Sequence, residues 1–312
     1  MKIIFMGTPD FAVTILENLI EAGHEIAMVF TQPDRPKGRG KKLQAPPVAE
    51  YAKAHGLSLL QPDSVRTPEI EGVFRDIGAD VVIVAAYGRI IPDNLLSLPK
   101  YGFINVHASL LPKYRGAAPI QWALRNGDAQ TGVSIMQLET GLDEGPVYRE
   151  ASLRIQPEWN KKDLFDALAV LGAETLLKTL EDIDHLSPQP QDHEHATYAP
   201  MFDKKDGCID FTMSAQDIVN LHRALEPDDS IYAFINNKRL AFKHASVSDN
   251  IRNIQDAPGT VVAVTKKSFS IATGNGVIEI SEVQPAGKKS MPVQTYLNGH
   301  PIKIGDRFSN ES

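Results

Sequence analysis

Residues 103–119 read FINVHASLLPKYRGAAP, an apolar strand-like run that ends in a polar loop. Asn105 and His107 are two positions apart, so on a strand both side chains lie on the same face. Pro112 then prevents the segment from continuing as an interior strand or a helix. An amide donor beside a group that relays protons, at the end of a strand, suits a developing oxyanion. For each residue alone, the alternative is a buried structural side chain.

The segments around this motif alternate between apolar strands and helices. Strands are predicted at 2–6, 24–30, 80–85, 102–107 and 132–138, and a helix at 162–180. This alternation predicts an α/β fold with a doubly wound, mostly parallel, Rossmann-like sheet, whose ligands bind beyond the carboxyl ends of the strands. We therefore expect the loop after His107 to lie at the ligand-binding edge.

A Pro-rich, charge-mixed stretch separates this part of the chain from a second one. We expect a catalytic domain at 1–184, a linker at 185–203 and a smaller domain at 204–312. His193 and His195 are interpreted as linker residues rather than metal ligands. In the smaller domain, a helix is predicted near 214–225, followed by short strands at 231–235, 240–247, 260–264, 269–272 and 277–280. Strands of this number and length predict a small β-barrel.

Composition and charge exclude several classes of protein. The 312 residues favour two domains, and the net charge of −7 argues against a protein that coats nucleic acid. Cys208 is the only cysteine, which excludes an intramolecular disulfide and a multi-cysteine metal site. The chain has no apolar run of the roughly 20 residues that span a membrane, and Gly7 interrupts the apolar N-terminus. We therefore expect a cytoplasmic monomer without a membrane partner.

The motif N-V-H-x-S-L-L-P-x-x-R-G at residues 105–116 resembles the signature of the folate-dependent formyltransferases. Further segments resemble the branch of that family that acts on methionyl-tRNA: MGTPDF at 6–11, FTQPDRP at 30–36, GRGKKL at 38–43, GAAPIQ at 116–121 and QPAGKK at 284–289. The resemblance runs from near residue 1 to about residue 305. It implies a formyltransferase fold with an OB-like second domain.

The resemblance also implies the reaction. A formyl group would pass from 10-formyl-tetrahydrofolate to the α-amine of methionyl initiator tRNA, with no metal required. Asp143 lies in a glycine-bounded loop, where an aspartate alone is usually a turn residue. In the family, however, the L-D-x-G segment carries a catalytic aspartate. Asn105 and His107 would then face the oxyanion, and Asp143 would orient or charge His107; which group holds the proton is left open.

The folate is expected to lie against the loop that follows His107. The apolar side chains of the segment Ser109, Leu110, Leu111 and Pro112 would wall a ring, although ordinary core packing is the alternative for the two leucines. Main-chain groups at Tyr87, Gly88 and residues 138–143 would contact the flat, polar-edged pterin.

A basic segment at 33–47 is the expected tRNA contact. Its glycines and prolines predict neither helix nor strand, and its cations can neutralise phosphates at the acceptor arm. A solvated surface loop is the alternative. The predicted tRNA-binding residues are Arg39, Lys41 and Lys42, extended by Lys288 and Lys289 of the second domain.

The sequence leaves three rival functions. A formyltransferase for a small amine, such as an amino sugar nucleotide, would share Asn105, His107 and Asp143 without needing the basic segment. A dinucleotide-dependent oxidoreductase is disfavoured because the first turn lacks G-x-G-x-x-G and has Pro9 instead. A non-enzymatic RNA-binding module is disfavoured by the net charge. One departure stands out: residues 225–230 read LEPDDS where the family usually has Asn-Pro-Trp-Pro.

Overall fold

The computed structural model describes residues 1–37, 42–248 and 256–311 and divides the chain into two compact units. The first unit consists of residues 1–119, 130–155 and 164–200, and the second of residues 120–129, 156–163 and 201–312. The second unit is thus assembled from three separate stretches of the chain. Residues 185–200, which we expected to form a linker, group with the first unit.

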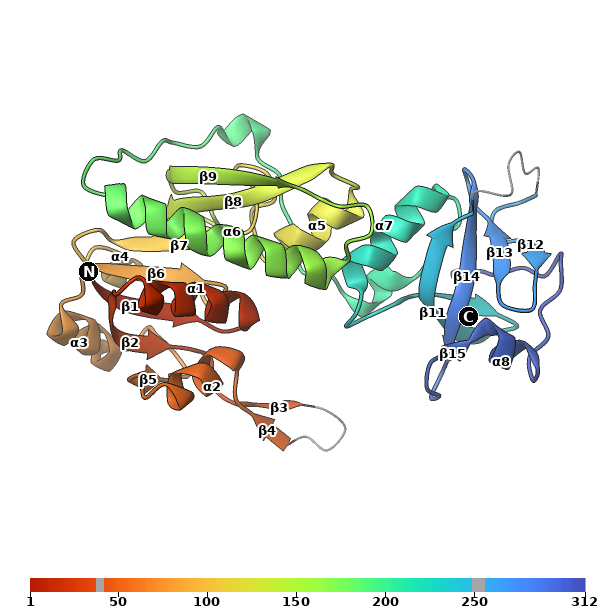
Figure 1. Cartoon of the computed structure of the whole chain (residues 1–312), viewed down its shortest axis with the longest axis horizontal. Helices are drawn as coiled ribbons and strands as arrows, with labels where there is room; N and C mark the ends of the chain where they lie inside the picture. Colours follow the sequence, from red (N-terminus) through yellow and green to blue (C-terminus); the bar gives the residue numbers. More distant parts are fainter. Residues whose placement is uncertain (38–41, 249–255, 312) are drawn as a thin grey trace. The chain divides into compact units, whose positions relative to one another are not determined.

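The first unit contains a seven-stranded sheet with the order β5-β2-β1-β6-β7-β8-β9 (Figure 1). Neighbouring strands from β5 to β7 are parallel, whereas β8 is antiparallel to both β7 and β9. In that order the strands are Leu59–Leu60, Glu25–Phe30, Lys2–Gly7, Val81–Ala85, Phe103–His107, Gln130–Gln137 and Val147–Arg154. The mostly parallel sheet confirms the predicted fold class.

Helices cover both faces of this sheet, which explains why every residue of β6 is buried. On one face a Cβ at Gly172 would lie only 2.8 Å from Val106 of β7, so α6 approaches the sheet closely. On the other face Phe74 of α3 stacks on Phe103, with ring centroids 5.7 Å apart. The helices of this unit are α1 (Asp10–Glu21), α2 (Pro47–Ala54), α3 (Pro68–Ile77), α4 (Asp93–Leu96), α6 (Lys161–Asp182) and the 3₁₀ turn His193–His195. The first three residues of α6, Lys161–Asp163, group with the second unit.

The basic segment at residues 33–47 contains two short strands that were not predicted. Strands β3 (Arg35–Lys37) and β4 (Lys42–Gln44) pair as a two-stranded antiparallel ribbon, where we expected neither helix nor strand. Pro36 is tolerated because an isolated ribbon leaves one edge of each strand unpaired, and proline lacks only its N–H. Arg39 and Lys41 lie outside the described residues.

The second unit is built on an antiparallel sheet with the order β10-β11-β14-β13-β12, and β15 pairs with β14. Residues 306–309 join its two edges, because Ser309 pairs with Phe234 of β10 and Asp306 accepts a hydrogen bond from Val261 of β12. The sheet therefore closes in the OB-like manner that was predicted. Its strands are Ile231–Ile235, Lys238–Val247, Val261–Val264, Phe269–Ala272, Val277–Pro285 and Met291–Pro292, from β10 to β15.

Helix α7 (Ala215–Leu225) of the second unit begins where predicted, because the Ser214 hydroxyl accepts a hydrogen bond from the Asp217 amide. The other helices are α5 (Pro119–Arg125), α8 (Val293–Leu297) and the 3₁₀ turn Lys204–Gly207. Among the described residues, no helix is long and apolar enough to cross a membrane. The same residues contain no cluster of three histidine, cysteine or acidic side chains suited to a metal ion.

Candidate active site

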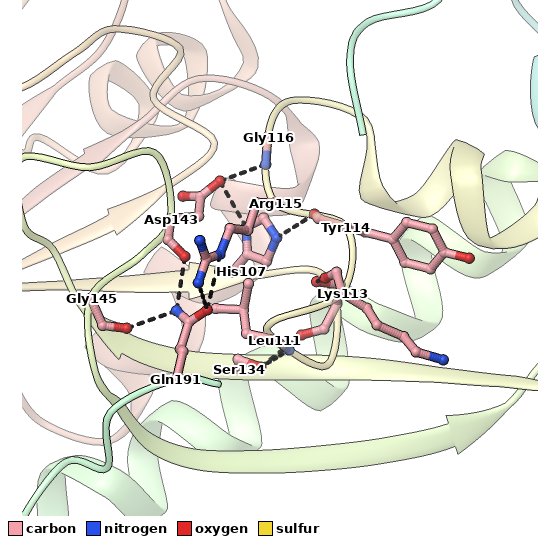
Figure 2. A network of polar contacts seen from close by, with 11 residues as sticks. His107, Leu111, Lys113, Tyr114, Arg115, Gly116, Ser134, Asp143, Gly145 and Gln191 are labelled. Atoms are coloured by element: carbon pink, nitrogen blue, oxygen red, sulfur yellow. Dashed lines mark hydrogen bonds and ion pairs between the residues drawn. The ribbon is translucent and has the colours of Figure 1, made fainter. Parts of the chain in front are cut away.

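His107 lies at the carboxyl end of β7 and is only 5% exposed (Figure 2). Its Nε2 is 2.9 Å from the carbonyl oxygen of Tyr114. Because a carbonyl can only accept, Nε2 must carry a proton. In the neutral imidazole Nδ1 therefore keeps its lone pair, and this atom lies 3.7 Å from Oδ2 of Asp143. The nitrogen that can take up a proton thus faces the carboxylate.

Asp143 reaches His107 by a route that the sequence did not predict. Strand β8 runs antiparallel to β7, so its end at Gln137 lies beside Ile104, away from the carboxyl end of β7 that carries His107. The loop of residues 138–146 starts at the beginning of β7, where the amide of Leu138 donates a hydrogen bond to the carbonyl of Phe103. His107 is at the other end of β7, about 13 Å away, so the loop must turn back along the sheet to bring Asp143 to it. Gly145 permits this turn, because a Cβ there would lie 2.0 Å from the Gln137 carbonyl oxygen.

The carboxylate of Asp143 is held from the neighbouring loop. Its Oδ2 accepts a hydrogen bond of 2.8 Å from the amide of Gly116, which follows the motif arginine (Figure 2). The same oxygen is the one nearest to His107 Nδ1. Gly116 therefore fixes the side-chain direction of Asp143 toward the imidazole.

The loops that follow β6, β7 and β8 each contain a non-glycine residue with positive φ. Among the described residues, five non-glycine residues have positive φ, and three of them follow β6, β7 and β8: Ala86 (46°), Tyr114 (59°) and Asp143 (52°). Non-glycine residues in this region persist only where their surroundings hold them. Two of the three, Tyr114 and Asp143, supply the oxygens that lie 2.9 and 3.7 Å from the two ring nitrogens of His107.

Asn105 is partly buried two residues before His107, between Val84 of β6 and Met136 of β8. Its side chain shares the sheet face of His107 because the two are separated by one strand period. Within the described residues its amide makes no hydrogen bond, so the amide protons remain available to a ligand. The role of Asn105 as an oxyanion donor stays a prediction.

The loop after His107 is folded on itself by two serines. The fully buried Ser109 donates its hydroxyl proton to the carbonyl of Lys113 over 2.6 Å. Ser134 of β8 accepts a hydrogen bond of 3.0 Å from the amide of Leu111, whose side chain is also buried. Leu110 and Pro112 remain partly exposed, so these two can present an apolar wall to a ligand.

The carbonyl groups at Tyr87 and Gly88 are already engaged. Tyr87 accepts hydrogen bonds from the Thr8 hydroxyl at 2.9 Å and from Gln32 Nε2 at 3.0 Å, and Gly88 accepts from the same nitrogen. Beside them lies a pocket of about 340 Å³. Its lining consists of Ser64, Val65, Arg66, Arg89 and Ile90.

The two arginines of this pocket have no acid or carbonyl partner within the part of the chain that the structure describes. An arginine guanidinium carries a permanent positive charge and fits a carboxylate through two parallel hydrogen bonds. The pocket therefore has the chemistry of an anion site, and Arg89 and Ile90 place it in the segment that follows β6. In doubly wound sheets ligands bind where the strand order reverses, and here that point lies between β1 and β6.

The predicted tRNA-binding residues fall on separate elements. Lys42 is exposed at the start of β4, while Lys288 and Lys289 are exposed in the turn that follows β14. The altered segment after α7 has its own contacts: Asp228 accepts a hydrogen bond of 2.6 Å from Lys161, and Glu226 lies 3.7 Å from His222. Two of the three acids that stand in place of the family segment, Glu226 and Asp228, thus lie against side chains of the second unit.

Sequence reasoning missed two buried polar residues of this site, Arg115 and Gln191. Arg115 is part of the motif and only 1% exposed, so its place in the signature was the available signal. Gln191 lies in the stretch that we interpreted as a linker, and no signal in its sequence context marks it. Its amide nitrogen donates to the carbonyls of both Asp143 and Gly145.

Comparisons with known proteins agree with the motif. A family model described as "Formyl transferase" matches residues 1–180, and another described as "Formyl transferase, C-terminal domain" matches residues 201–301. A protein of Acetivibrio thermocellus named methionyl-tRNA formyltransferase is 44% identical over 308 residues, which cover 98% of this chain and 99% of that protein. One of the same name from Lachnospira eligens is 43% identical over 310 residues, with 98% of each covered.

Among solved structures, the fold resembles that of HypX from Aquifex aeolicus in complex with tetrahydrofolic acid. The match has a TM-score of 0.64 at 16% identity and covers 99% of this chain and 50% of that one. At this level of identity the likeness concerns the fold.

Proposed function

The chain belongs to the formyl transferase family, and from this premise we propose that it transfers the formyl group of 10-formyl-tetrahydrofolate to the α-amine of methionyl initiator tRNA. The observation that carries the proposal is the identity of more than 40% to proteins named methionyl-tRNA formyltransferase, over nearly the whole length of both chains. The product, formylmethionyl-tRNA, would serve the initiation of translation.

In the proposed reaction the methionyl amine attacks the formyl carbon, so that a new C–N bond forms and an oxyanion develops. Asn105, whose amide has no other partner in the described structure, would donate a hydrogen bond to this oxyanion. As the intermediate collapses, the bond between the formyl carbon and the folate nitrogen breaks. One proton must therefore leave the attacking amine and one must reach the leaving nitrogen.

His107 and Asp143 are suited to this proton traffic. With Nε2 bound to Tyr114, Nδ1 is the only ring nitrogen of His107 that can exchange a proton. Asp143 would stabilise the imidazolium that forms when Nδ1 takes up the amine proton. The imidazolium would then return a proton to the folate nitrogen.

The folate would lie with its rings against Leu110 and Pro112. Its glutamate tail carries carboxylates, which we assign to the pocket lined by Arg66 and Arg89. Two unpartnered guanidinium groups in a pocket that otherwise has Val65 and Ile90 in its wall support an acidic ligand there. The pterin is at the opposite end of folate from the glutamate tail, so its main-chain contacts would be made at residues 138–143, whereas Tyr87 and Gly88 would lie beside the tail.

For the tRNA, we propose contacts to phosphates by the ribbon of β3 and β4 with the residues between them, and by the turn after β14. The named cations are Arg39, Lys41, Lys42, Lys288 and Lys289. A formyltransferase for a small amine has no use for these cations, which is why their removal separates the two candidate substrates.

The direct test offers labelled 10-formyl-tetrahydrofolate together with methionyl-tRNA or with an amino sugar nucleotide. We expect label in the tRNA alone, and preferential labelling of the sugar would refute the proposed acceptor.

Replacing Arg39, Lys41 and Lys42 by alanine should raise KM for tRNA and make this KM depend less steeply on salt concentration, with folate binding unchanged. As a control we suggest alanine at three exposed cations elsewhere in the first unit, Lys53, Arg154 and Lys178.

A further inference from the structure

The segment of residues 189–199 is hydrogen-bonded to both loops that meet at His107. At its start, Gln189 and Val147 exchange two backbone hydrogen bonds of 2.8 Å. At its end, Thr197 accepts a bond of 2.8 Å from the amide of Arg115, and Ala199 donates one of 2.8 Å to the Arg115 carbonyl. The segment is therefore a structural strap over the site rather than a free connection.

Gln191 lies between these anchors and is only 8% exposed (Figure 2). Its Nε2 donates to the carbonyl oxygens of Asp143 and Gly145, both at 2.8 Å. Its Oε1 accepts from Nε and Nη2 of Arg115, at 3.1 and 2.8 Å. A glutamine amide offers two donor protons and two lone pairs, so its whole hydrogen-bonding capacity is used.

Arg115 makes this arrangement rigid. The guanidinium is 1% exposed and also contacts Glu144 through Nη1 at 3.3 Å and His193 Nδ1 through Nη2 at 3.3 Å. A buried cation cannot give up its acceptors without a large penalty. Arg115 therefore fixes Oε1 of Gln191, and the planar amide then fixes where its two protons point.

We propose that Gln191 is a positioning residue for formyl transfer, which holds the backbone of Asp143 so that its carboxylate faces Nδ1 of His107. Asp143 has φ of 52°, a conformation that persists only where neighbours impose it. Gln191 binds the carbonyl oxygens of Asp143 and Gly145, on both sides of Glu144, and so restrains the backbone that carries this conformation. The inference rests on the proposed roles of His107 and Asp143.

The side chain required here is narrowly defined. Glutamate at position 191 would keep the acceptor for Arg115 but has no proton for the Asp143 and Gly145 carbonyls. Asparagine is one methylene shorter and cannot span the same partners without moving the strap. Methionine has a similar length and no hydrogen-bonding protons, so Gln191→Met removes the bonds while retaining most of the volume.

The test compares Gln191→Met with Gln189→Met in the full-length chain. Gln189 is an exposed residue of the same strap whose side chain only reaches the Ser187 carbonyl, which makes it a matched control. We expect Gln191→Met to lower kcat for formyl transfer by about 10- to 100-fold with little change in either KM, because a small misplacement of a proton-handling group has this effect. In an Asp143→Asn background, Gln191→Met should add less than a twofold further loss.

A second readout does not need turnover. Histidine-selective NMR should show that Gln191→Met moves the ring nitrogen resonances of His107, whereas Gln189→Met leaves them in place. A native kcat in Gln191→Met would overturn the proposal. So would a loss of kcat on Gln191→Met that is equally large in the wild-type and in the Asp143→Asn background. If Gln191→Met does not fold, Gln191→Asn takes its place with the same two expectations. If the wild-type chain transfers no formyl group, the proposed function fails, and the NMR comparison still decides the positioning.

Discussion

The stability of the second unit should fall as pH decreases, because of one buried histidine. His222 of α7 is 4% exposed, and its Nδ1 has no hydrogen-bond partner in the described structure. Burial lowers the pKa of His222 from 6.5 to about 4, with smaller contributions from the nearby charges of His244 and Lys243. The perturbation we suggest is His222→Gln, which keeps a polar side chain that cannot titrate.

The expected magnitude follows from the pKa. A pKa of about 4 in the folded chain and 6.5 in the unfolded chain corresponds to about 3 kcal/mol, since a tenfold change is about 1.4 kcal/mol. Between these values the unfolded state binds the extra proton, so the free energy of unfolding decreases as pH falls from 6.5 toward 4. Above pH 6.5 the effect is absent.

Glu226 opposes this trend. Burial raises its pKa, with Glu282 and Asp163 adding to the rise and His244 and Lys243 reducing it. A carboxyl with a raised pKa takes up its proton in the folded state first, so it adds stability as pH falls through that pKa. The net loss in the wild-type chain should therefore be smaller than that from His222 alone. The background variant Glu226→Gln should expose the full loss.

Tryptophan fluorescence can follow the unfolding of the second unit. Its two tryptophans, Trp122 and Trp159, both belong to the second unit, so their fluorescence during urea unfolding reports on that unit. We would measure the free energy of unfolding at pH 7, 6, 5 and 4.5 for the wild type, His222→Gln and the exposed control His300→Gln. An unchanged pH dependence in His222→Gln would refute the reasoning.

Three further predictions concern the site. Asn105→Ala should lower turnover by about 10²–10³-fold with folate binding unchanged, as measured by single-turnover kinetics and a binding titration. Asp143→Asn and His107→Ala should each nearly abolish transfer and the double variant should be little worse, whereas losses that multiply would contradict a joint role. Arg89→Ala should weaken tetrahydrofolate binding by about 10-fold in a fluorescence titration, with no effect on an analogue that lacks the glutamate.

The β7 motif was predictable because it is local. A period of two places Asn105 and His107 on one face, and the structure keeps both at the end of the strand. Asp143 could be named from its family resemblance alone, since its position depends on β8 running antiparallel. That direction is set by the pairing of β8 with β7 and β9, which no periodicity within β8 records.

The strap was not predictable for a related reason. Its prolines and charges are typical of a linker, yet the partners of Gln191 and Thr197 lie many positions earlier in the chain. These contacts form because the loops after β7 and β8 lie beside the strap in the folded chain, and no local sequence pattern records this. In contrast, the first four strands of the second unit were predicted to within two residues, because turns such as Gly274-Asn275-Gly276 mark their limits. Strand β14 continues to Pro285, five residues beyond its predicted end, and β15 was not predicted.

The interleaving of the two units has a consequence for recombination between relatives. An exchange at residue 200 would combine residues 120–129 and 156–163 of one parent with the barrel and α7 of another. Arg223 would tolerate this, because it donates to the main-chain carbonyls of Gln156 and Trp159, which any parent supplies. The pair of Lys161 and Asp228 depends on side chains from both parents. A viable chimaera should therefore take all three stretches of the second unit, residues 120–129, 156–163 and 201–312, from the same parent.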